Sequence, residues 1–326
     1  MHADARPTCL ADVSEEGLLA RILPMMRSED PRVLIGPGDD AAVLATPDGR
    51  IVVTTDAMTR GPDWLDEWST GAQVGAKSVA QNLGDVAAMG SVPLGLVVTL
   101  LADPQTPLAW AEDLARGIGR AAAAAGCPVL GGDLSGAPAG QLTVSITAFG
   151  DLQGRAPVLR SGARDGDVLA VAGTLGRSAA GLALLVEGRG AQDDPVVRGL
   201  VDVHLAPVAP YHQGPIAADA GATAMLDLSD GLIRDAGQMA AASGALFAID
   251  SALLAQDVAA MADVLGHAAS LECALTGGEE HSLLATFPPD VRLPEGWRAI
   301  GAVCSGSGVT VDGVPRGGGG WDHFAG

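Results

Sequence analysis

Three observations predict a mixed α/β protein with two domains. The 326 residues exceed the roughly 100 to 200 residues of a single domain. Strand-like and helix-like apolar patterns occur together in both halves of the chain. Residues 150–164, rich in Gly, Arg and Pro, separate the two halves. We therefore expect an N-terminal domain over residues 1–153 and a C-terminal domain over residues 154–326.

The first half begins with two predicted strands, over residues 32–44 and 50–58, joined by a turn at Pro47-Asp48-Gly49. This arrangement is typical of a hairpin. Ser69 or Thr70 is suited to cap a following helix that runs to Gly90. The remaining expected elements are a strand over 92–101, a helix over 107–125, and strands over 128–133 and 141–152.

The second half continues with the same mixture of strands and helices. Apolar residues on one helical face support a helix over 231–243. We find no internal repeat, and the only low-complexity stretches are 121–125 and 317–320. The other expected elements are a strand over 167–173, a helix over 178–187 and a strand over 222–230.

Composition excludes several classes of protein. A hydrophobic content of 48% is too high for a disordered acidic chain, and a net charge of −20 would repel nucleic acid. The longest apolar run, Val92–Ala102, is about half of the roughly 20 residues that cross a bilayer. The first residues lack a basic start followed by an apolar stretch, so we expect a cytoplasmic protein.

Acidic residues recur where apolar or small-residue runs end, usually beside glycine. A carboxylate at the edge of a core is costly unless a cation or hydrogen bonds compensate it, and few basic residues are nearby. Hard oxygen ligands suit Mg²⁺, which binds through a few carboxylates and substrate phosphates. One Asp beside Gly is more often a turn or cap residue, but six such segments indicate a magnesium–phosphate site. The segments are IGPGDDAAVL, VVTTDAM, NLGDVAAMG, VLGGDLSG, MLDLSDG and LTGGEEHSLL.

Familiar catalytic motifs are absent. GAQVGAKS, at residues 71–78, differs from a P-loop because Ala76 replaces the glycine before Lys77. The segment from Gly36 lacks the third glycine of a dinucleotide fingerprint. Neither HExxH nor GxSxG occurs, so we expect the six histidines to be structural or surface residues.

Eight ordered motifs closely resemble those of the thiamine-monophosphate kinase family. They are GPGDDAAVL, TTD, NLGDVAAMG, GGDLSG, LRSGARDGD, LDLSDGL, GGEEHSL and GWDHF, and they span about residues 33–324. The family belongs to the superfamily of aminoimidazole ribonucleotide synthetase, which binds ATP without a P-loop. The resemblance implies a two-domain synthetase-like fold, with an N-terminal sheet that forms a barrel across a homodimer and a C-terminal α/β domain.

The reaction that this resemblance implies is transfer of the ATP γ-phosphoryl group to thiamine monophosphate, with several Mg²⁺ ions. No catalytic general base is expected, because a phosphate monoester with a second pKa of about 6 is already ionised at neutral pH. The implied metal ligands are Asp40, Thr54, Thr55, Asp56, Asp85, Asp133, Asp227 and Asp230. The implied ATP-binding residues are Gly132, Asp133, Arg160 and Ser229. The implied contacts to the thiamine substrate are Asp63, Glu279 and Trp321.

Two segments depart from the family pattern. Asp63 stands where many members carry a substrate-contacting histidine, and an ionised Asp accepts but does not donate a hydrogen bond. GGEEHSL replaces the commoner GGEDYEL, which keeps Glu279 but changes its flank to Glu280 and His281.

Structural roles remain open for several of these residues. Arg160 could be a surface charge in a polar linker, and Trp321 could dock the end of the chain. Glu279 could cap a helix after the two glycines, and Ser229 could cap a turn. The alternative functions are another ATP-dependent enzyme of the superfamily or a non-catalytic protein that binds divalent metal, although the EF-hand spacing is absent.

Overall fold

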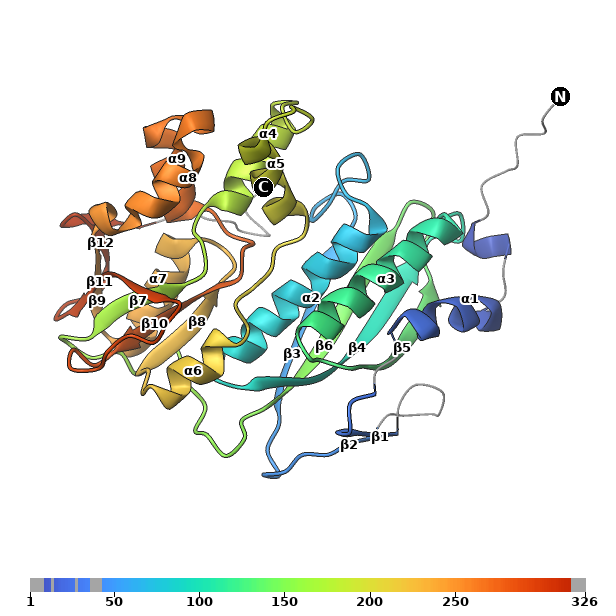
Figure 1. The fold of residues 1–326 in the computed structure, drawn as a ribbon, viewed down its shortest axis with the longest axis horizontal. Coiled ribbons are helices and arrows are strands. Elements are labelled where there is room, and N and C mark those ends of the chain that lie inside the picture. Colours follow the sequence, from blue (N-terminus) through green and yellow to red (C-terminus); the bar gives the residue numbers. More distant parts are fainter. Residues whose placement is uncertain (1–8, 13–14, 27–28, 36–42, 318–326) are drawn as a thin grey trace. The chain divides into compact units, whose positions relative to one another are not determined.

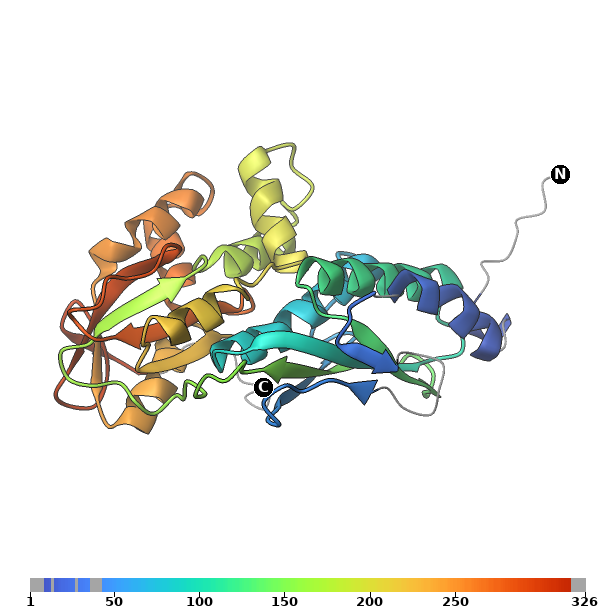
Figure 2. The ribbon, with the colours of Figure 1, turned by 60° about the horizontal axis from the view of Figure 1, so that its bottom comes forward.

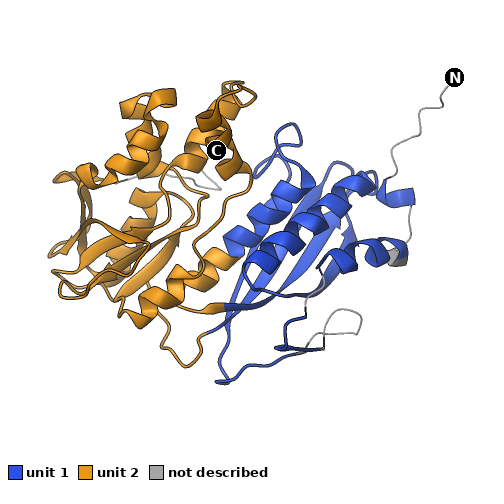
Figure 3. Cartoon of the chain, viewed as in Figure 1, with its two compact units in different colours: residues 1–82, 93–151 blue, residues 83–92, 152–326 orange. Residues whose placement is uncertain are grey.

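The computed structural model describes residues 9–12, 15–26, 29–35 and 43–317, and they form two compact units (Figure 1, Figure 3). The first unit comprises residues 1–82 and 93–151, and the second comprises residues 83–92 and 152–326. The division therefore falls inside one long helix, whose last turns belong to the second unit.

The first unit contains short helices at its N-terminal end and a four-stranded sheet. Its helical elements are η1 (Leu10–Asp12), α1 (Glu15–Ile22), η2 (Leu23–Met26), most of α2 (Gly71–Ala88) and α3 (Leu108–Ala124). Its strands are β1 (Val33–Ile35), β2 (Val43–Leu44), β3 (Val52–Thr59), β4 (Val92–Ala102), β5 (Val129–Gly136) and β6 (Leu142–Asp151).

The sheet of the first unit has the order β3-β6-β4-β5. β3 is antiparallel to β6 and β4 is parallel to β5, with Asp56 opposite Ile146 and Asp133 opposite Thr99. In both views α2 and α3 lie against one face of this sheet (Figure 1, Figure 2). Helix α1 adds a small apolar core against α3, where Leu18 packs with Leu108.

Helix α2 begins with the cap that the sequence predicts. The Thr70 Oγ1 accepts a hydrogen bond from the backbone N–H of Gln73 at 3.3 Å, and the Gln73 Oε1 accepts one from the N–H of Thr70 at 2.9 Å. This reciprocal pair is a capping box. Lys77 lies buried in the middle of the helix, which confirms that its segment is not a phosphate loop.

The predicted hairpin between segments 32–44 and 50–58 is wrong. Strand β3 pairs with β6, whereas β2 pairs with β1 in a separate two-stranded sheet. An alternating pattern identifies a strand but not its partner, and here the partner comes from a segment roughly 90 residues later.

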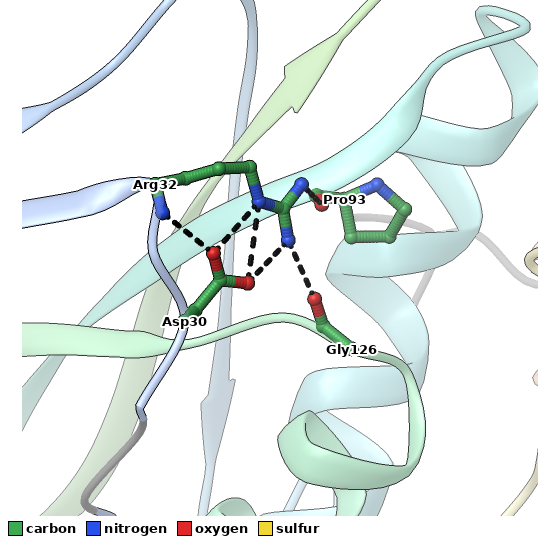
Figure 4. A network of polar contacts seen from close by, with 4 residues as sticks. All are labelled: Asp30, Arg32, Pro93 and Gly126. Atoms are coloured by element: carbon green, nitrogen blue, oxygen red, sulfur yellow. Dashed lines mark hydrogen bonds and ion pairs between the residues drawn. The ribbon is translucent and has the colours of Figure 1, made fainter.

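An arginine network fixes the segment before β1 within the first unit (Figure 4). The Arg32 guanidinium donates to both carboxylate oxygens of Asp30, with the shortest distance 2.6 Å. It also donates to the carbonyl oxygens of Pro93 at 3.0 Å and Gly126 at 2.9 Å. The side-chain hydrogen bond from Arg32 lowers the pKa of Asp30, against the effect of burial.

The second unit contains a larger sheet surrounded by helices. Its helical elements are α4 (Arg177–Val186), α5 (Pro195–Leu205), α6 (Gln213–Asp219), α7 (Leu232–Ser243), η3 (Ser251–Leu254), α8 (Ala255–Leu265) and α9 (His267–Thr276). Its strands are β7 (Val168–Ala172), β8 (Ala224–Leu228), β9 (Leu246–Ile249), β10 (Ser282–Phe287), β11 (Trp297–Cys304), β12 (Gly308–Val311) and β13 (Val314–Arg316).

The seven strands of the second sheet have the order β13-β12-β9-β11-β7-β10-β8. Its core joins β7, β8, β10 and β11 to the end of α2 and to α6, through residues such as Ala87, Ala217, Met225 and Phe287. Burial of this apolar surface is the main stabilising contribution. Strand β8 is antiparallel to β10, so the end of β8 lies beside the start of β10.

The structure confirms the predicted mixed α/β class and most of the predicted elements. Within the described part of the chain, no helix combines the length and the apolar character needed to cross a membrane. The barrel shared by two chains stays a prediction, because a single chain does not test it.

Candidate active site

The TTD motif lies on β3, and its side chains point to both faces of the first sheet. Met58 contacts α2 through the Ser78 hydroxyl, and Thr54 and Asp56 lie on the same face because side chains alternate along a strand. Thr55 points the other way, and its Oγ1 donates to the carbonyl oxygen of Ile146 at 3.0 Å. The structure therefore brings Thr54 and Asp56 together but separates the Thr55 side chain from them.

Asp56 is held by a residue that sequence reasoning missed. The Asn82 Oδ1 accepts a hydrogen bond from the backbone N–H of Asp56 at 3.1 Å. The Asn82 Nδ2 donates to the carbonyl oxygen of Ser78 at 2.9 Å, and the side chain is fully buried. A signal was available, because Asn82 begins the NLGD motif.

The GGD motif lies on β5, at the opposite edge of this sheet from β3. A Cβ atom at Gly132 would lie 1.8 Å from the carbonyl oxygen of Val98, so the close approach of β4 requires glycine there. Asp133 is exposed, and its Oδ2 accepts a hydrogen bond from the Ser135 hydroxyl at 2.8 Å. Two strands separate Asp133 from Asp56, so the two are not direct neighbours in the sheet.

Asp63 follows β3 in the turn that leads to α2. Its Oδ2 accepts a hydrogen bond from the backbone N–H of Thr59 at 2.6 Å. The carboxylate therefore closes this turn, as Asp commonly does through a nearby backbone N–H. Contact with substrate stays a prediction for Asp63.

The LDLSDG motif ends β8 in the second unit, and every residue of this strand is buried. Asp227 is only 6% exposed, and its Oδ2 lies 3.1 Å from Nδ1 of His281. Burial lowers the pKa of His281, but the hydrogen bond with Asp227 and the charges of Asp227, Glu279 and Asp85 outweigh it and raise the pKa. Asp85, in the last turns of α2, thus acts on the same imidazole.

A second missed residue, Asp235, stabilises the loop after β8. Its Oδ2 accepts hydrogen bonds from the backbone N–H groups of Asp230 at 3.0 Å and Gly231 at 3.1 Å. Burial raises the pKa of Asp235 to about 7; the Asp230 N–H opposes this, and the charges of Asp230 and Asp227 add to it. Negative charge is therefore concentrated at this loop.

Arg160 is connected to this loop through Gln238. The Arg160 Nη1 donates to Gln238 Oε1 at 2.9 Å, and the Gln238 Nε2 donates to Asp235 Oδ1 at 3.3 Å. These three side chains form a hydrogen-bonded chain that ends at the backbone of Asp230. Arg160 is exposed, and it therefore presents a cation beside the acidic loop.

The GGEEH motif precedes β10 and packs directly on the loop after β8. A Cβ atom at Gly278 would lie 2.0 Å from the carbonyl oxygen of Ser229, and the Glu279 N–H donates to that same oxygen at 2.9 Å. Ser229 and Glu279 are therefore adjacent. The alternative of a helix cap at Glu279 is wrong, because the segment leads into a strand.

The Glu279 and Glu280 carboxylates point to different partners. Glu279 Oε2 lies 3.4 Å from Nδ1 of His204, which in turn lies 3.1 Å from the Ser178 hydroxyl. Glu280 accepts hydrogen bonds from the Thr174 hydroxyl and from the N–H of Ser178, in the first turn of α4. Burial raises the pKa of Glu280, against these hydrogen bonds. His204 is a third residue that the sequence did not reveal.

Asp40 and Trp321 lie outside the described residues. Among the residues that are described, no three His, Cys, Asp or Glu side chains gather closely enough to hold a metal ion. The candidate ligands are instead divided: Thr54, Thr55, Asp56 and Asp133 belong to the first unit, and Asp85, Asp227 and Asp230 belong to the second.

Comparison with known proteins identifies the family. The family model for the AIR synthase related protein, N-terminal domain, matches residues 38–152. A curated thiamine-monophosphate kinase from Mycobacterium tuberculosis is 45% identical over 303 residues, which cover 91% of this chain and 88% of the relative. The chain belongs to the thiamine-monophosphate kinase family.

Solved structures of thiamine-monophosphate kinases share the fold. That from Stenotrophomonas maltophilia K279a matches with a TM-score of 0.80 and 31% identity, over 92% of this chain and 96% of that chain. AaThiL complexed with AMPPCP and TMP matches with a TM-score of 0.79 and 31% identity, over 99% and 100% of the two chains. The resemblance carried by the eight motifs is confirmed, and with it the synthetase-like fold.

Proposed function

We propose that the chain transfers the γ-phosphoryl group of ATP to thiamine monophosphate, which yields thiamine diphosphate and ADP. The observation that carries this proposal is the 45% identity to a curated thiamine-monophosphate kinase across 91% of the chain. The complex of a relative with AMPPCP, an ATP analogue, and TMP supports the choice of both substrates.

The donor set fits Mg²⁺. The candidate ligands are carboxylate and hydroxyl oxygens, and the raised pKa of Asp235 reflects burial and the charges of Asp227 and Asp230 that a cation would neutralise. We assign the ligation of several Mg²⁺ ions to Asp40, Thr54, Thr55, Asp56, Asp85, Asp133, Asp227 and Asp230. Bound Mg²⁺ would neutralise charge on the transferring phosphoryl group.

The chain's own cation for the nucleotide is Arg160. Its hydrogen bond to Gln238 holds the guanidinium beside the loop that carries Ser229 and Asp230. A planar guanidinium suits phosphate oxygens, so we assign Arg160 to the ATP phosphates. Ser229, Gly132 and Asp133 are assigned to the same nucleotide.

The thiamine moiety is assigned to Asp63, Glu279 and Trp321. The Glu279 side chain is 40% exposed, so its carboxylate is accessible for a hydrogen bond from the aminopyrimidine. An indole such as that of Trp321 attracts a cationic thiazolium. The nucleophile is a phosphate oxygen of thiamine monophosphate, which is ionised near neutral pH and needs no general base.

We propose a homodimer, in which the sheet of the first unit forms a barrel with that of a second chain. We also propose a cytoplasmic location, where ATP is available as co-substrate. Sedimentation equilibrium tests the dimer, and cell fractionation tests the location.

A substrate comparison tests the proposed function. Purified protein is incubated with ATP, Mg²⁺ and thiamine monophosphate, free thiamine or an aminoimidazole-pathway substrate, and the products are identified by mass. We expect thiamine diphosphate from the monophosphate alone, and EDTA should abolish its formation. A product from either other substrate, with none from the monophosphate, would overturn the assignment.

A further inference from the structure

His281 makes a buried hydrogen bond to a candidate metal ligand. Its Nδ1 lies 3.1 Å from Oδ2 of Asp227, and the two side chains are only 4% and 6% exposed. A carboxylate oxygen accepts hydrogen bonds, so Nδ1 of His281 carries the N–H and donates it to Asp227. Hydrogen bonds to metal-binding carboxylates fix the orientation of the carboxylate.

The backbone at His281 has an uncommon conformation that serves this contact. Its φ angle is +51°, in the left-handed region, and Glu279 two residues earlier has φ of +65°. Residues other than glycine occupy this region only when the surrounding structure holds them there, and such residues cluster at functional sites. Here the two conformations place the Glu279 and His281 side chains on different partners, His204 and Asp227.

Helix α2 leaves room for the pair. A Cβ atom at Gly84 would lie 3.1 Å from Cβ of His281 and 3.4 Å from Oδ2 of Asp227. The glycine lets the helix backbone pass against both residues, one position before Asp85. Gly84, His281 and Asp227 thus form one packed group in the second unit, and Asp85 is the next residue of α2.

We propose that His281 is a positioning residue that holds the Asp227 carboxylate for the divalent cation; this rests on the metal role assigned to Asp227 in the proposed function. The buried position of Asp227 on β8 leaves its carboxylate few ways to be satisfied by water. The His281 donor occupies Oδ2 and restrains the plane of the carboxylate, and it would thereby set how Asp227 is presented to a bound cation. The imidazole thus acts on the cation only through Asp227.

Binding of Mn²⁺, measured by electron paramagnetic resonance without nucleotide, tests this role. We expect His281→Leu to raise the Mn²⁺ dissociation constant by about 10- to 100-fold, because the carboxylate loses its donor. His281→Asn should bind almost as the unsubstituted chain does, since its amide N–H takes the place of the Nδ1 donor and Asn tolerates the left-handed backbone.

The matched control is His267→Leu, which changes an exposed histidine at the start of α9 and should leave Mn²⁺ binding unchanged. If His281→Leu does not fold, His281→Gln replaces it in the test. The side-chain amide of Gln places its donor one bond further from the backbone, so this variant should also weaken Mn²⁺ binding. Parental affinity in a folded His281→Leu or His281→Gln variant would overturn the inference, as would the absence of Mn²⁺ binding by the unsubstituted chain.

Failure of the proposed function gives a different result from failure of the positioning role of His281. If the unsubstituted chain binds Mn²⁺ but forms no thiamine diphosphate, the substrate assignment is wrong, whereas the comparison of His281 variants still decides the positioning role.

Discussion

Asn82 of helix α2 accepts a hydrogen bond from the backbone N–H of Asp56 on strand β3, at 3.1 Å. The same buried amide donates to the carbonyl oxygen of Ser78 one helical turn earlier. The strand that carries the TTD motif is therefore fixed to the helix at the position of its acid.

Replacement of Asn82 by Ala should destabilise the protein and reduce turnover. The change leaves the Asp56 N–H without its acceptor, and a buried unpaired donor costs about 1–3 kcal/mol. Urea unfolding measures the loss, and the turnover number for thiamine diphosphate formation measures the effect on Asp56. Equal stability of Asn82→Ala and the unsubstituted chain would contradict the role.

Asp56→Asn and Asp133→Asn should each reduce turnover by at least about 100-fold while the fold remains intact. Both substitutions keep the side-chain shape but remove a charge that we assign to Mg²⁺. Circular dichroism checks the fold. Asp290→Asn, at an exposed position, is the matched control. Unchanged turnover in either variant would refute the metal assignment at that residue.

Removal of the Gln238 side chain should weaken ATP binding selectively. Gln238→Ala removes the 2.9 Å hydrogen bond that orients the Arg160 guanidinium. The guanidinium is then less well positioned to bind the ATP phosphates. We expect a several-fold higher KM for ATP and an unchanged KM for thiamine monophosphate, roughly the effect of one hydrogen bond with a net contribution of about 0.5–1.5 kcal/mol. Equal changes in both constants would instead indicate a general structural effect.

The stability of the metal-free protein should depend on the ionisation of Asp235. Its pKa of about 7 in the folded chain exceeds the ordinary value of 3.8, so the folded state favours the neutral carboxyl. The contribution of the neutral Asp235 carboxyl to folding stability is fully present below about pH 4 and is lost as the pH rises towards 7. With EDTA present, the free energy of unfolding should fall across this range. Asp235→Asn should make the free energy of unfolding depend less on pH. If the variant and the unsubstituted chain show the same pH profile, Asp235 is not the group responsible.

Trp321→Ala should chiefly raise the KM for thiamine monophosphate, by about 2- to 30-fold, because a cation–π contact contributes about 0.5–2 kcal/mol. Steady-state kinetics measures this value. The KM for ATP is the internal control, and an unaltered KM for thiamine monophosphate would leave Trp321 with a structural role.

Local sequence patterns predict the helices and strands better than they predict which strands pair with each other. The Thr70 cap, the apolar face of α7 and the all-buried run of β8 are encoded within a few residues, and the structure confirms each element. The partner of β3 was not predictable, because alternation along a strand specifies a face and not a neighbour.

In the candidate site, too, the sequence reveals contiguous motifs but not the contacts between distant residues. The acidic motifs were visible because each is contiguous, whereas His281 meets Asp227 across 54 positions and Asn82 meets Asp56 across 26. A search for local histidine motifs does not find such pairs. Once β8 and β10 are known to be adjacent and antiparallel, the contact between the LDLSDG and GGEEH motifs follows directly.

Transfer of isotope from ATP tests the central claim most directly. ATP labelled with ¹⁸O at the three terminal oxygens of the γ-phosphoryl group is incubated with the protein, Mg²⁺ and thiamine monophosphate, and the products are analysed by mass. Direct transfer predicts thiamine diphosphate that carries all three labelled oxygens, with unlabelled ADP. Label found only in inorganic phosphate, with no labelled thiamine diphosphate, would contradict the account.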